Sequence, residues 1–340
     1  MQRARSSGSV TAAAWRFCVA PMMDWTDRHC RYFHRRLSAH ARLYTEMVTT
    51  GALLQGDPRR HLEFDAEEHP VALQIGGSEP DDLARAARLG AQWGYDEINL
   101  NCGCPSERVQ RGAFGACLMA EPALVADCVK AMRDAVDIAV TVKHRIGVDR
   151  HEDYGFVRDF VGALAAAGCE VFIVHARNAW LKGLSPRENR EVPPLRYDVV
   201  HRLKADFPSL VFVLNGGLAT LDAAEAELAH VDGVMLGRAA YHDPWLLAQV
   251  DVRFFGDEAV HFAREEVVER MTAYLHREVA RGTAPRHIVR HMLGLYQGLR
   301  GARQWRRQLS DATVLECDGA DVLTRAAARI AAPRAAVRAV

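Results

Sequence analysis

Short, uniformly apolar runs alternate with longer amphipathic stretches between residue 17 and about residue 255 of the chain. Runs of this kind are typical of parallel strands that are buried on both faces. The stretches between them have the apolar spacing of helices that cover such a sheet. The expected strands cover eight segments: 17–20, 41–47, 71–75, 94–100, 138–143, 171–174, 210–214 and 233–236.

Eight strand–helix units over this length predict an α/β fold of the TIM (β/α)8 barrel type. A doubly wound sheet is the alternative, but its glycine fingerprint is missing after the first strand. Beyond residue 255 the apolar runs stop, and helices are expected at 258–281, 285–299 and 302–309. We therefore expect a barrel domain over 16–255 and a C-terminal all-helical domain over 256–330. Disordered tails are expected over 1–15 and 331–340.

Composition adds little about function. Lys plus Arg and Asp plus Glu both number 43, so the net charge neither supports nor excludes a polyanionic partner. The eight cysteines are scattered without a CxxC pair, so we expect no metal site. A reduced, cytoplasmic protein is the simplest interpretation. No apolar run is long enough for a membrane span, so no membrane partner is expected.

A cysteine follows the fourth expected strand. Cys104 lies in a sharp loop with Gly103 and Pro105, at the carboxyl end of a strand, where parallel α/β folds place their chemistry. A buried structural cysteine is the commoner role for a single thiol. The residues that follow the other strands favour a catalytic role for Cys104.

Polar residues and glycines follow most of the other expected strands. Because strand ends converge on one face of a barrel, these residues are expected to be neighbours. Glycine turns after the last two strands are typical of a phosphate site. Lys143 needs an anionic partner, either a barrel carboxylate or the electron-rich edge of a flavin. The full set is Pro21, Met22, Met23, Gln74, Asn101, Cys104, Lys143, His175, Asn215, Gly216, Gly217, Gly237 and Arg238.

Positive charge is concentrated near the C-terminus. The segment 285–310 contains no acidic residue, and a second basic pair, Arg187 and Arg190, follows the sixth strand. An uneven distribution of this kind favours a nucleic-acid surface, although a solvated basic helix is the simpler alternative. The arginines of the segment are Arg286, Arg290, Arg300, Arg303, Arg306 and Arg307.

The chain resembles the tRNA-dihydrouridine synthase family, specifically its A-type members. The resemblance covers nearly the whole chain. One departure is Cys102, where a small aliphatic residue is usual, and it places a second thiol near Cys104. The stretches that carry the resemblance include APMMDWTDRHCRYF from Ala20, INLNCGCPSERVQRGAFGACLM from Ile98, VKHRIG from Val142, VHARNAWLKGLSPRENREVPPL from Val174 and HMLGLYQGLRGARQWRR from His291.

The resemblance implies an FMN-dependent oxidoreductase with NADPH as its reductant. Such an enzyme reduces the C5=C6 bond of tRNA D-loop uridines at positions 20 and 20a to 5,6-dihydrouridine. Hydride goes from reduced FMN to C6, and Cys104 donates the proton to C5. The target base must leave its stack to reach the barrel. The helical domain would bind the tRNA, and the enzyme is expected to act as a monomer.

The resemblance also assigns roles to residues. Cys104 is the catalytic residue. FMN is expected to contact Pro21, Met22, Met23, Gln74, Lys143, His175, Asn215, Gly216, Gly217, Gly237 and Arg238. The tRNA is expected to contact Asn101, Arg187, Arg190, Arg303 and Arg306.

Two other functions stay open at this point. An FMN-dependent barrel can reduce a free pyrimidine, but a free base needs no basic helical domain. A catalytically silent tRNA-binding protein would share the fold, but Cys104, Lys143 and His175 would then have no reason to occur together.

Overall fold

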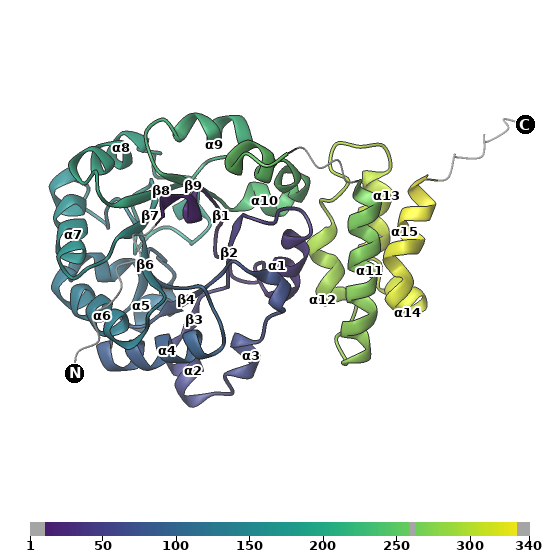
Figure 1. The fold of residues 1–340 in the computed structure, drawn as a ribbon, viewed down its shortest axis with the longest axis horizontal. Helices are drawn as coiled ribbons and strands as arrows, with labels where there is room; N and C mark the ends of the chain where they lie inside the picture. Colours follow the sequence, from purple (N-terminus) through teal and green to yellow (C-terminus); the bar gives the residue numbers. More distant parts are fainter. Residues whose placement is uncertain (1–10, 259–262, 332–340) are drawn as a thin grey trace, which may run out of the picture.

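The computed structural model describes residues 11–258 and 263–331, and its core is a closed barrel of parallel strands (Figure 1). The ring closes because β1 pairs with both β9 and β2, and β2 pairs with β4. This closure confirms the predicted TIM barrel. The strands are β1 (Phe17–Val19), β2 (Arg42–Tyr44), β3 (Val48–Thr49), β4 (Val71–Gly76), β5 (Glu97–Cys102), β6 (Ala139–Arg145), β7 (Val171–His175), β8 (Val211–Asn215) and β9 (Gly233–Leu236).

The second barrel strand is interrupted. We expected one strand over 41–47, whereas β2 ends at Tyr44 and β3 resumes the pairing with β4 opposite Ile75 and Gly76. Between them the Thr45 hydroxyl accepts the Gln74 backbone N–H at 3.0 Å, so a side chain replaces a backbone partner there. Together β2 and β3 occupy one of the eight barrel positions.

Helices form the outer layer of the barrel (Figure 1). Outward side chains such as Leu73, Ile98 and Phe172 are fully buried in the core between strands and helices. The helices of this layer are α1 (Arg28–Arg35), α2 (Thr50–Gln55), α3 (Arg59–Leu62), α4 (Pro80–Gln92), α6 (Pro122–Ala135), α7 (Tyr154–Ala166), α8 (Tyr197–Asp206), α9 (Leu221–Glu227) and α10 (Arg238–His242). The short helix α5 (Glu107–Arg111) follows β5 and lies beyond the end of the barrel. Among the described residues, no helix combines the length and apolarity of a membrane span.

The start of the barrel lies earlier than predicted. We expected a disordered tail over 1–15, of which residues 1–10 lie outside the described part. Residues Ala12–Trp15 form a 3₁₀ turn, and the Trp15 side chain is buried with its Nε1 donating to Glu97 at 2.8 Å. The predicted boundary was therefore wrong, because an aromatic side chain closes the amino-terminal end of the barrel.

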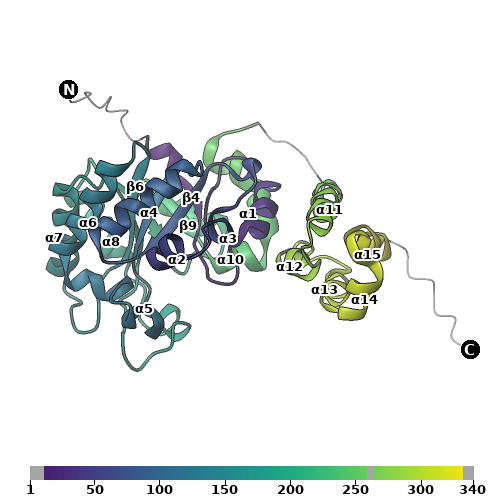
Figure 2. The same cartoon turned by 90° about the horizontal axis from the view of Figure 1, so that it is seen from below.

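Five helices stand beside the barrel, next to α1 and α10 (Figures 1 and 2). The helix predicted over 285–299 is mostly absent, since α12 ends at Val289 and a single 3₁₀ turn follows. Two glycines lie in the turns that follow: Gly298 has a positive φ of 77°, and a Cβ on Gly294 would lie 2.2 Å from the His242 carbonyl. The helices are α11 (Arg264–Ala280), α12 (Arg286–Val289), α13 (Ala302–Ser310), α14 (Ala312–Asp318) and α15 (Val322–Ala331).

The first helix and the tail of the C-terminal part also differ from their predicted limits. The helix expected from residue 258 begins at Arg264, and residues 259–262 lie outside the described part of the chain. The tail expected over 331–340 lies outside it from residue 332 onward.

Charged and aromatic contacts join the five helices to the barrel. Asp27 caps α1 and also pairs with Arg290 at 2.6 Å and with His291 at 3.0 Å. The ring of Tyr274 on α11 stacks on Tyr32 of α1, with centroids 3.9 Å apart. The helical part is thus anchored on α1, which follows the first barrel strand.

Candidate active site at the carboxyl end of the barrel

The loop after β5 holds Cys104 at the end of the barrel from which α5 projects (Figure 2). The Asn101 side-chain oxygen accepts the backbone N–H groups of Gly103 at 3.1 Å and Cys104 at 3.0 Å. The Cys104 carbonyl accepts the Ala116 N–H at 2.9 Å. The thiol is only half-buried, and its Sγ lies 3.5 Å from Ser106 Oγ. This sulfur is therefore fixed in position without being enclosed.

Cys102 lies apart from this thiol. Side chains alternate along a strand, so Cys102 points to the helix layer while Asn101 points inward. Cys102 is fully buried in the outer core, and burial raises its pKa well above the usual value. The two thiols therefore differ in exposure: Cys102 belongs to the core, whereas Cys104 is half-buried at the barrel end.

A lysine that bonds to an amide, Lys143, lies beside Cys104. Lys143 Nζ donates to the Asn215 side-chain oxygen at 2.9 Å, so the barrel carboxylate considered as an alternative is not the partner shown. Burial and, to a smaller extent, the charge of Arg145 lower the pKa of Lys143 to about 7, while Cys104 opposes the shift. Lys143 is thus a cation that an incoming anion would stabilise.

Sequence reasoning did not single out Arg145, which is almost fully buried. Its Nε donates to the Gly103 carbonyl at 3.0 Å, and its Nη1 donates to the carbonyls of Asn178 at 3.0 Å and Asn189 at 2.8 Å. Arg145 therefore joins the Cys104 loop to the segment after β7. Its position two residues beyond Lys143 on the same strand was the available signal, because both then face inward.

The ends of β7 and β8 form a backbone cradle. Gly216 and Gly217 have φ values of 115° and 71°. A Cβ on Gly216 would lie 2.7 Å from the His175 ring, and one on Gly217 would lie 2.4 Å from Leu195. His175 stays neutral, because burial and the charges of Arg145 and Lys143 hold its pKa well below the usual range. A side chain at either position would collide with His175 or Leu195, so both positions require glycine.

The ends of β1 and β9 meet beside this cradle. A Cβ on Gly237 would lie 3.5 Å from Met22 Sδ, so the loop after β1 approaches the start of α10. Pro21 and Met22 are half-buried, whereas Met23 is 55% exposed. Arg238 donates to Glu191 at 2.6 Å, which places the segment after β7 beside the cradle too.

The segment after β7 is organised around one buried amide. Asn189 accepts the Trp180 N–H at 2.7 Å and donates to the carbonyls of Trp180 at 2.9 Å and Leu184 at 3.1 Å. This leaves the flanking Arg187 and Arg190 exposed at the surface. Arg190 lies close enough to Cys104 for their charges to interact.

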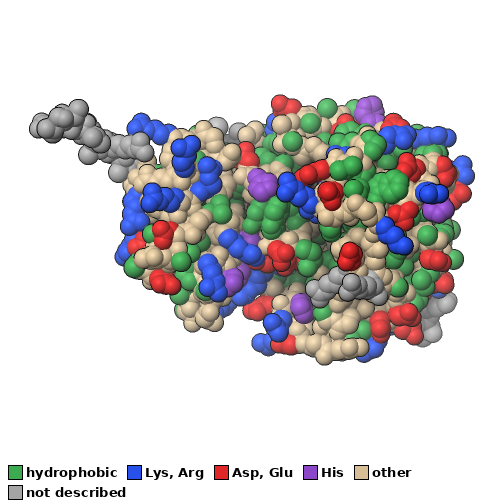
Figure 3. Space-filling view, turned by 180° about the vertical axis from the view of Figure 1, so that it is seen from behind, with side chains coloured by type: hydrophobic (Ala, Val, Ile, Leu, Met, Phe, Trp, Pro, Cys, Tyr) green, Lys and Arg blue, Asp and Glu red, His purple; other side chains and the backbone are tan. Residues whose placement is uncertain are grey.

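The basic residues of α13 lie on its outer face. Trp305 and Leu309 are buried, while Arg303, Arg306 and Arg307 are exposed. Figure 3 shows Lys and Arg side chains gathered over the part of the molecule that the C-terminal helices form. Not all arginines of the 285–310 segment belong to this surface, since Arg290 is paired with Asp27.

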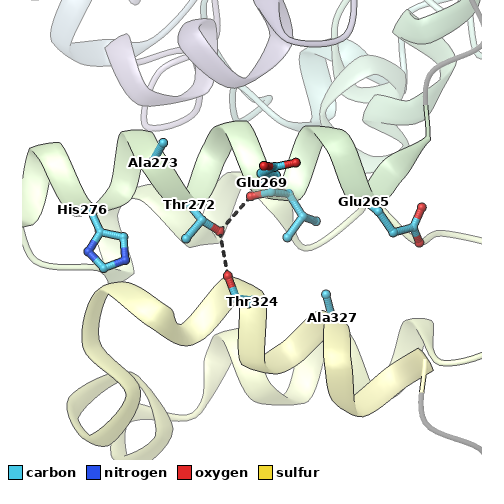
Figure 4. A pocket seen from close by; sticks show the side chains of 8 residues that line it. Glu265, Glu269, Thr272, Ala273, His276, Thr324 and Ala327 are labelled. Carbon is cyan, nitrogen blue, oxygen red and sulfur yellow. Dashed lines mark hydrogen bonds between the residues drawn. The ribbon is translucent and has the colours of Figure 1, made fainter.

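A separate groove lies between α11 and α15 (Figure 4). Two glutamates, Glu265 and Glu269, line it, and Thr272 Oγ1 lies 3.2 Å from Thr324 Oγ1 across it. Its carboxylates do not suit a polyanion, and none of the predicted site residues lines it.

Comparison with known proteins identifies similar chains. A family model described as Dihydrouridine synthase (Dus) matches residues 18–331. A tRNA-dihydrouridine(20/20a) synthase of Pseudomonas aeruginosa is 59% identical over 308 residues, covering 91% of this chain and 93% of its own. Proteins of the same name are 56% identical in Vibrio cholerae (93% of this chain, 96% of theirs) and 58% identical in Escherichia coli (88% and 90%).

A solved structure supports the fold alone. An old yellow enzyme homologue from Zymomonas mobilis superposes with a TM-score of 0.51, covering 74% of this chain and 92% of its own, at 12% sequence identity.

Proposed function

The chain belongs to the dihydrouridine synthase family, and from this premise we propose how its residues carry out the reaction. The protein is a tRNA-dihydrouridine synthase, an oxidoreductase that acts at positions 20 and 20a. Enzymes of this family depend on FMN and use NAD(P)H. The choice of NADPH, a monomeric enzyme, a cytoplasmic location and the D-loop as the bound region of the tRNA are parts of the proposal.

The residues at the barrel end suit FMN. The turn at Gly216 and Gly217 after β8 would offer backbone N–H groups to the FMN phosphate, and Arg238 would add a positive charge beside it. Lys143 is a half-buried cation that donates to the Asn215 amide, and it would suit an anionic ring edge. The remaining contacts would come from Pro21, Met22, Met23, Gln74, His175, Asn215 and Gly237. Bound and reduced, FMN supplies the hydride that C6 of uracil accepts.

Cys104 supplies the proton in this proposal. Addition of hydride at C6 leaves C5 basic, because the electron pair is shared with the C4 carbonyl. A fixed, half-buried thiol can protonate C5, and the resulting thiolate later regains its proton from water. Three cations lie near enough to interact with this thiolate: Lys143, Arg145 and Arg190. Positive charge beside a thiolate stabilises it.

The other proposed contacts divide between base and backbone. Asn101, beside Cys104, would bind an edge of the uracil. Arg187 and Arg190 would bind the tRNA near the barrel mouth, and Arg303 and Arg306 would bind phosphates on the helical part. In this division, residues up to about 255 are the catalytic domain and the helices from α11 onward are the tRNA-binding domain.

The observation that carries the proposal is the half-buried Cys104 thiol, fixed by Asn101 among three cations at the barrel end. The test is incubation of unmodified tRNA with the enzyme and NADPH, followed by mass mapping of nucleosides. Uridines 20 and 20a should each gain two hydrogens. Modification elsewhere, or of free uracil instead, would contradict the proposal.

A further inference from the structure

At one level inside the barrel, the inward positions of β4, β5 and β6 are polar: they hold Gln74, Asn99 and Thr141, which are paired in the register. At the same level, the inward positions of β7 and β8 are apolar, with Val171 and Val211. The inward side chains of these two strands become polar at their carboxyl ends, with His175 and Asn215. The side chains of Gln74, Asn99 and Thr141 are all buried. Because an unbonded polar group is costly there, their hydrogen-bond partners must lie inside the barrel.

The last of these polar side chains, Thr141, contacts the carboxylate of Glu97. Glu97 is fully buried and accepts hydrogen bonds from Trp15 Nε1 at 2.8 Å, Tyr44 OH at 2.9 Å and Arg42 Nη1 at 3.2 Å. Thr141 Oγ1 lies 2.5 Å from the same carboxylate. A carboxylate paired with an arginine has no hydrogen to donate, so the Thr141 hydroxyl donates to Glu97.

The direction of every later hydrogen bond follows from this first one. Thr141 has used its only hydrogen, so its oxygen accepts from Asn99 Nδ2 at 2.7 Å. Asn99 Oδ1 then accepts from Gln74 Nε2 at 2.7 Å, and Gln74 Oε1 accepts from Asn101 Nδ2 at 2.9 Å. If any one of these side-chain amides were rotated so that its oxygen and nitrogen exchanged places, it would face a donor with a donor or an acceptor with an acceptor, and the hydrogen bond would be lost.

The chain of hydrogen bonds ends at the catalytic loop. Asn101 Oδ1 accepts the N–H groups of Gly103 and Cys104, so the amide keeps one N–H for another partner. Gln74 keeps one N–H and one lone pair. The carboxylate at the closed end of the barrel thus determines which atoms Gln74 and Asn101 can offer to a ligand.

We propose that Glu97 and Thr141 are positioning residues for the reaction. They orient the amides of Gln74 and Asn101, and through Asn101 they hold the Cys104 loop. The inference rests on the proposed function, in which Gln74 contacts the flavin and Asn101 contacts the uracil.

The test compares two substitutions of one residue. Thr141→Val keeps the shape and removes the hydroxyl, whereas Thr141→Ser keeps the hydroxyl. Oxidation of the NADPH-reduced holoenzyme by tRNA should slow roughly 10- to 100-fold in Thr141→Val, since small displacements of reacting groups have effects of that size. The same variant should show an altered flavin absorption spectrum and weaker FMN binding. Thr141→Ser should stay close to the parent in all three measurements.

Val142→Ala is the matched control for lost stability. Val142 is fully buried in the outer core and has no part in the hydrogen-bond chain. This variant should lower the unfolding temperature and keep the parent spectrum and rate. A parent-like Thr141→Val, a Thr141→Ser as damaged as Thr141→Val, or a Val142→Ala as slow as Thr141→Val would each overturn the proposal.

The proposed function and the positioning role of Thr141 can fail separately. If tRNA does not oxidise the reduced parent enzyme, the proposed function fails. The flavin spectrum and FMN affinity are measured without tRNA, so they still decide whether Thr141 orients Gln74.

Discussion

Single residues at the strand ends create a site that is rich in positive charge and poor in carboxylates. Lys143 shows the consequence most clearly, because it donates to the neutral Asn215 amide. Burial favours the neutral amine and the charge of Arg145 adds to this effect, so the pKa of Lys143 is lowered to about 7. The site is therefore prepared for an anionic ligand, and Lys143 gives it a pH dependence.

Binding of FMN to the apoprotein should weaken as the pH rises above about 7, the pKa of free Lys143. An anionic ligand favours protonated Lys143, so binding takes up a proton above that pH and loses affinity as protons become scarce. Titrations by flavin fluorescence at several pH values measure this. Lys143→Met should bind FMN more weakly and lose the dependence above pH 7. The same slope in both proteins would show that another group is responsible.

At the residue scale the sequence predicted what lies at the ends of strands and missed what links one strand to another. Lys143, His175 and Asn215 follow apolar runs and could be named in advance. Arg145 and Thr141 lie on the same strand as Lys143, yet their roles depend on partners such as Gly103 and Asn99 on β5. No local pattern contains those partners.

Elements were predicted well where hydrophobic periodicity dominates. Strands β7, β8 and β9 agree with the predicted runs to within one residue at each end. The helix predicted over 285–299 ends already at Val289, and the turns that follow include Gly298 with its positive φ. Helix α13 was predicted nearly to its limits, and its exposed arginines make an element-scale prediction.

Replacing Arg303 and Arg306 together with glutamine should weaken tRNA binding and flatten its salt dependence. If each arginine neutralises one phosphate, the slope of log Kd against log salt should fall by about 2. Equilibrium binding at several salt concentrations measures the slope. A double variant of Arg85 and Arg158, exposed on α4 and α7, removes the same charge from the barrel surface and should keep the parent slope. Equal slopes in all three proteins would count against α13 as a tRNA contact.

At the scale of the whole molecule, the helical part is attached to the barrel through α1. Asp27 is central, since it caps α1 and also pairs with Arg290 and His291. Burial opposes its charge, but the hydrogen bond and charge of His291 hold the pKa of Asp27 below the usual range. Residues about 260 positions apart in sequence make this contact, so periodicity could not predict it.

Asp27→Asn should keep the helix cap, because asparagine caps as well as aspartate, and lose the ion pairs. We expect a loss of about 1–3 kcal/mol in the free energy of unfolding and a higher KM for tRNA, with flavin reduction by NADPH unchanged. Because the folded pKa is lowered, the stability difference should be present above about pH 4 and vanish as the pH falls further.

Asp153→Asn is the control for Asp27→Asn. Asp153 caps α7 by accepting the Phe156 N–H, so the exchange tests the cap alone. A stability loss as large as that of Asp27→Asn would show that the ion pairs contribute little.

The most direct test of the account follows one turnover at Cys104. Enzyme reduced by NADPH is mixed with unmodified tRNA, and flavin oxidation is followed in the parent and in Cys104→Ala. The account predicts that the variant binds tRNA and is reduced by NADPH as the parent is, while its oxidation by tRNA slows by about 10² to 10⁴, the usual contribution of a positioned acid. Oxidation of Cys104→Ala by tRNA at the parent rate would contradict the assignment of this thiol as the proton donor.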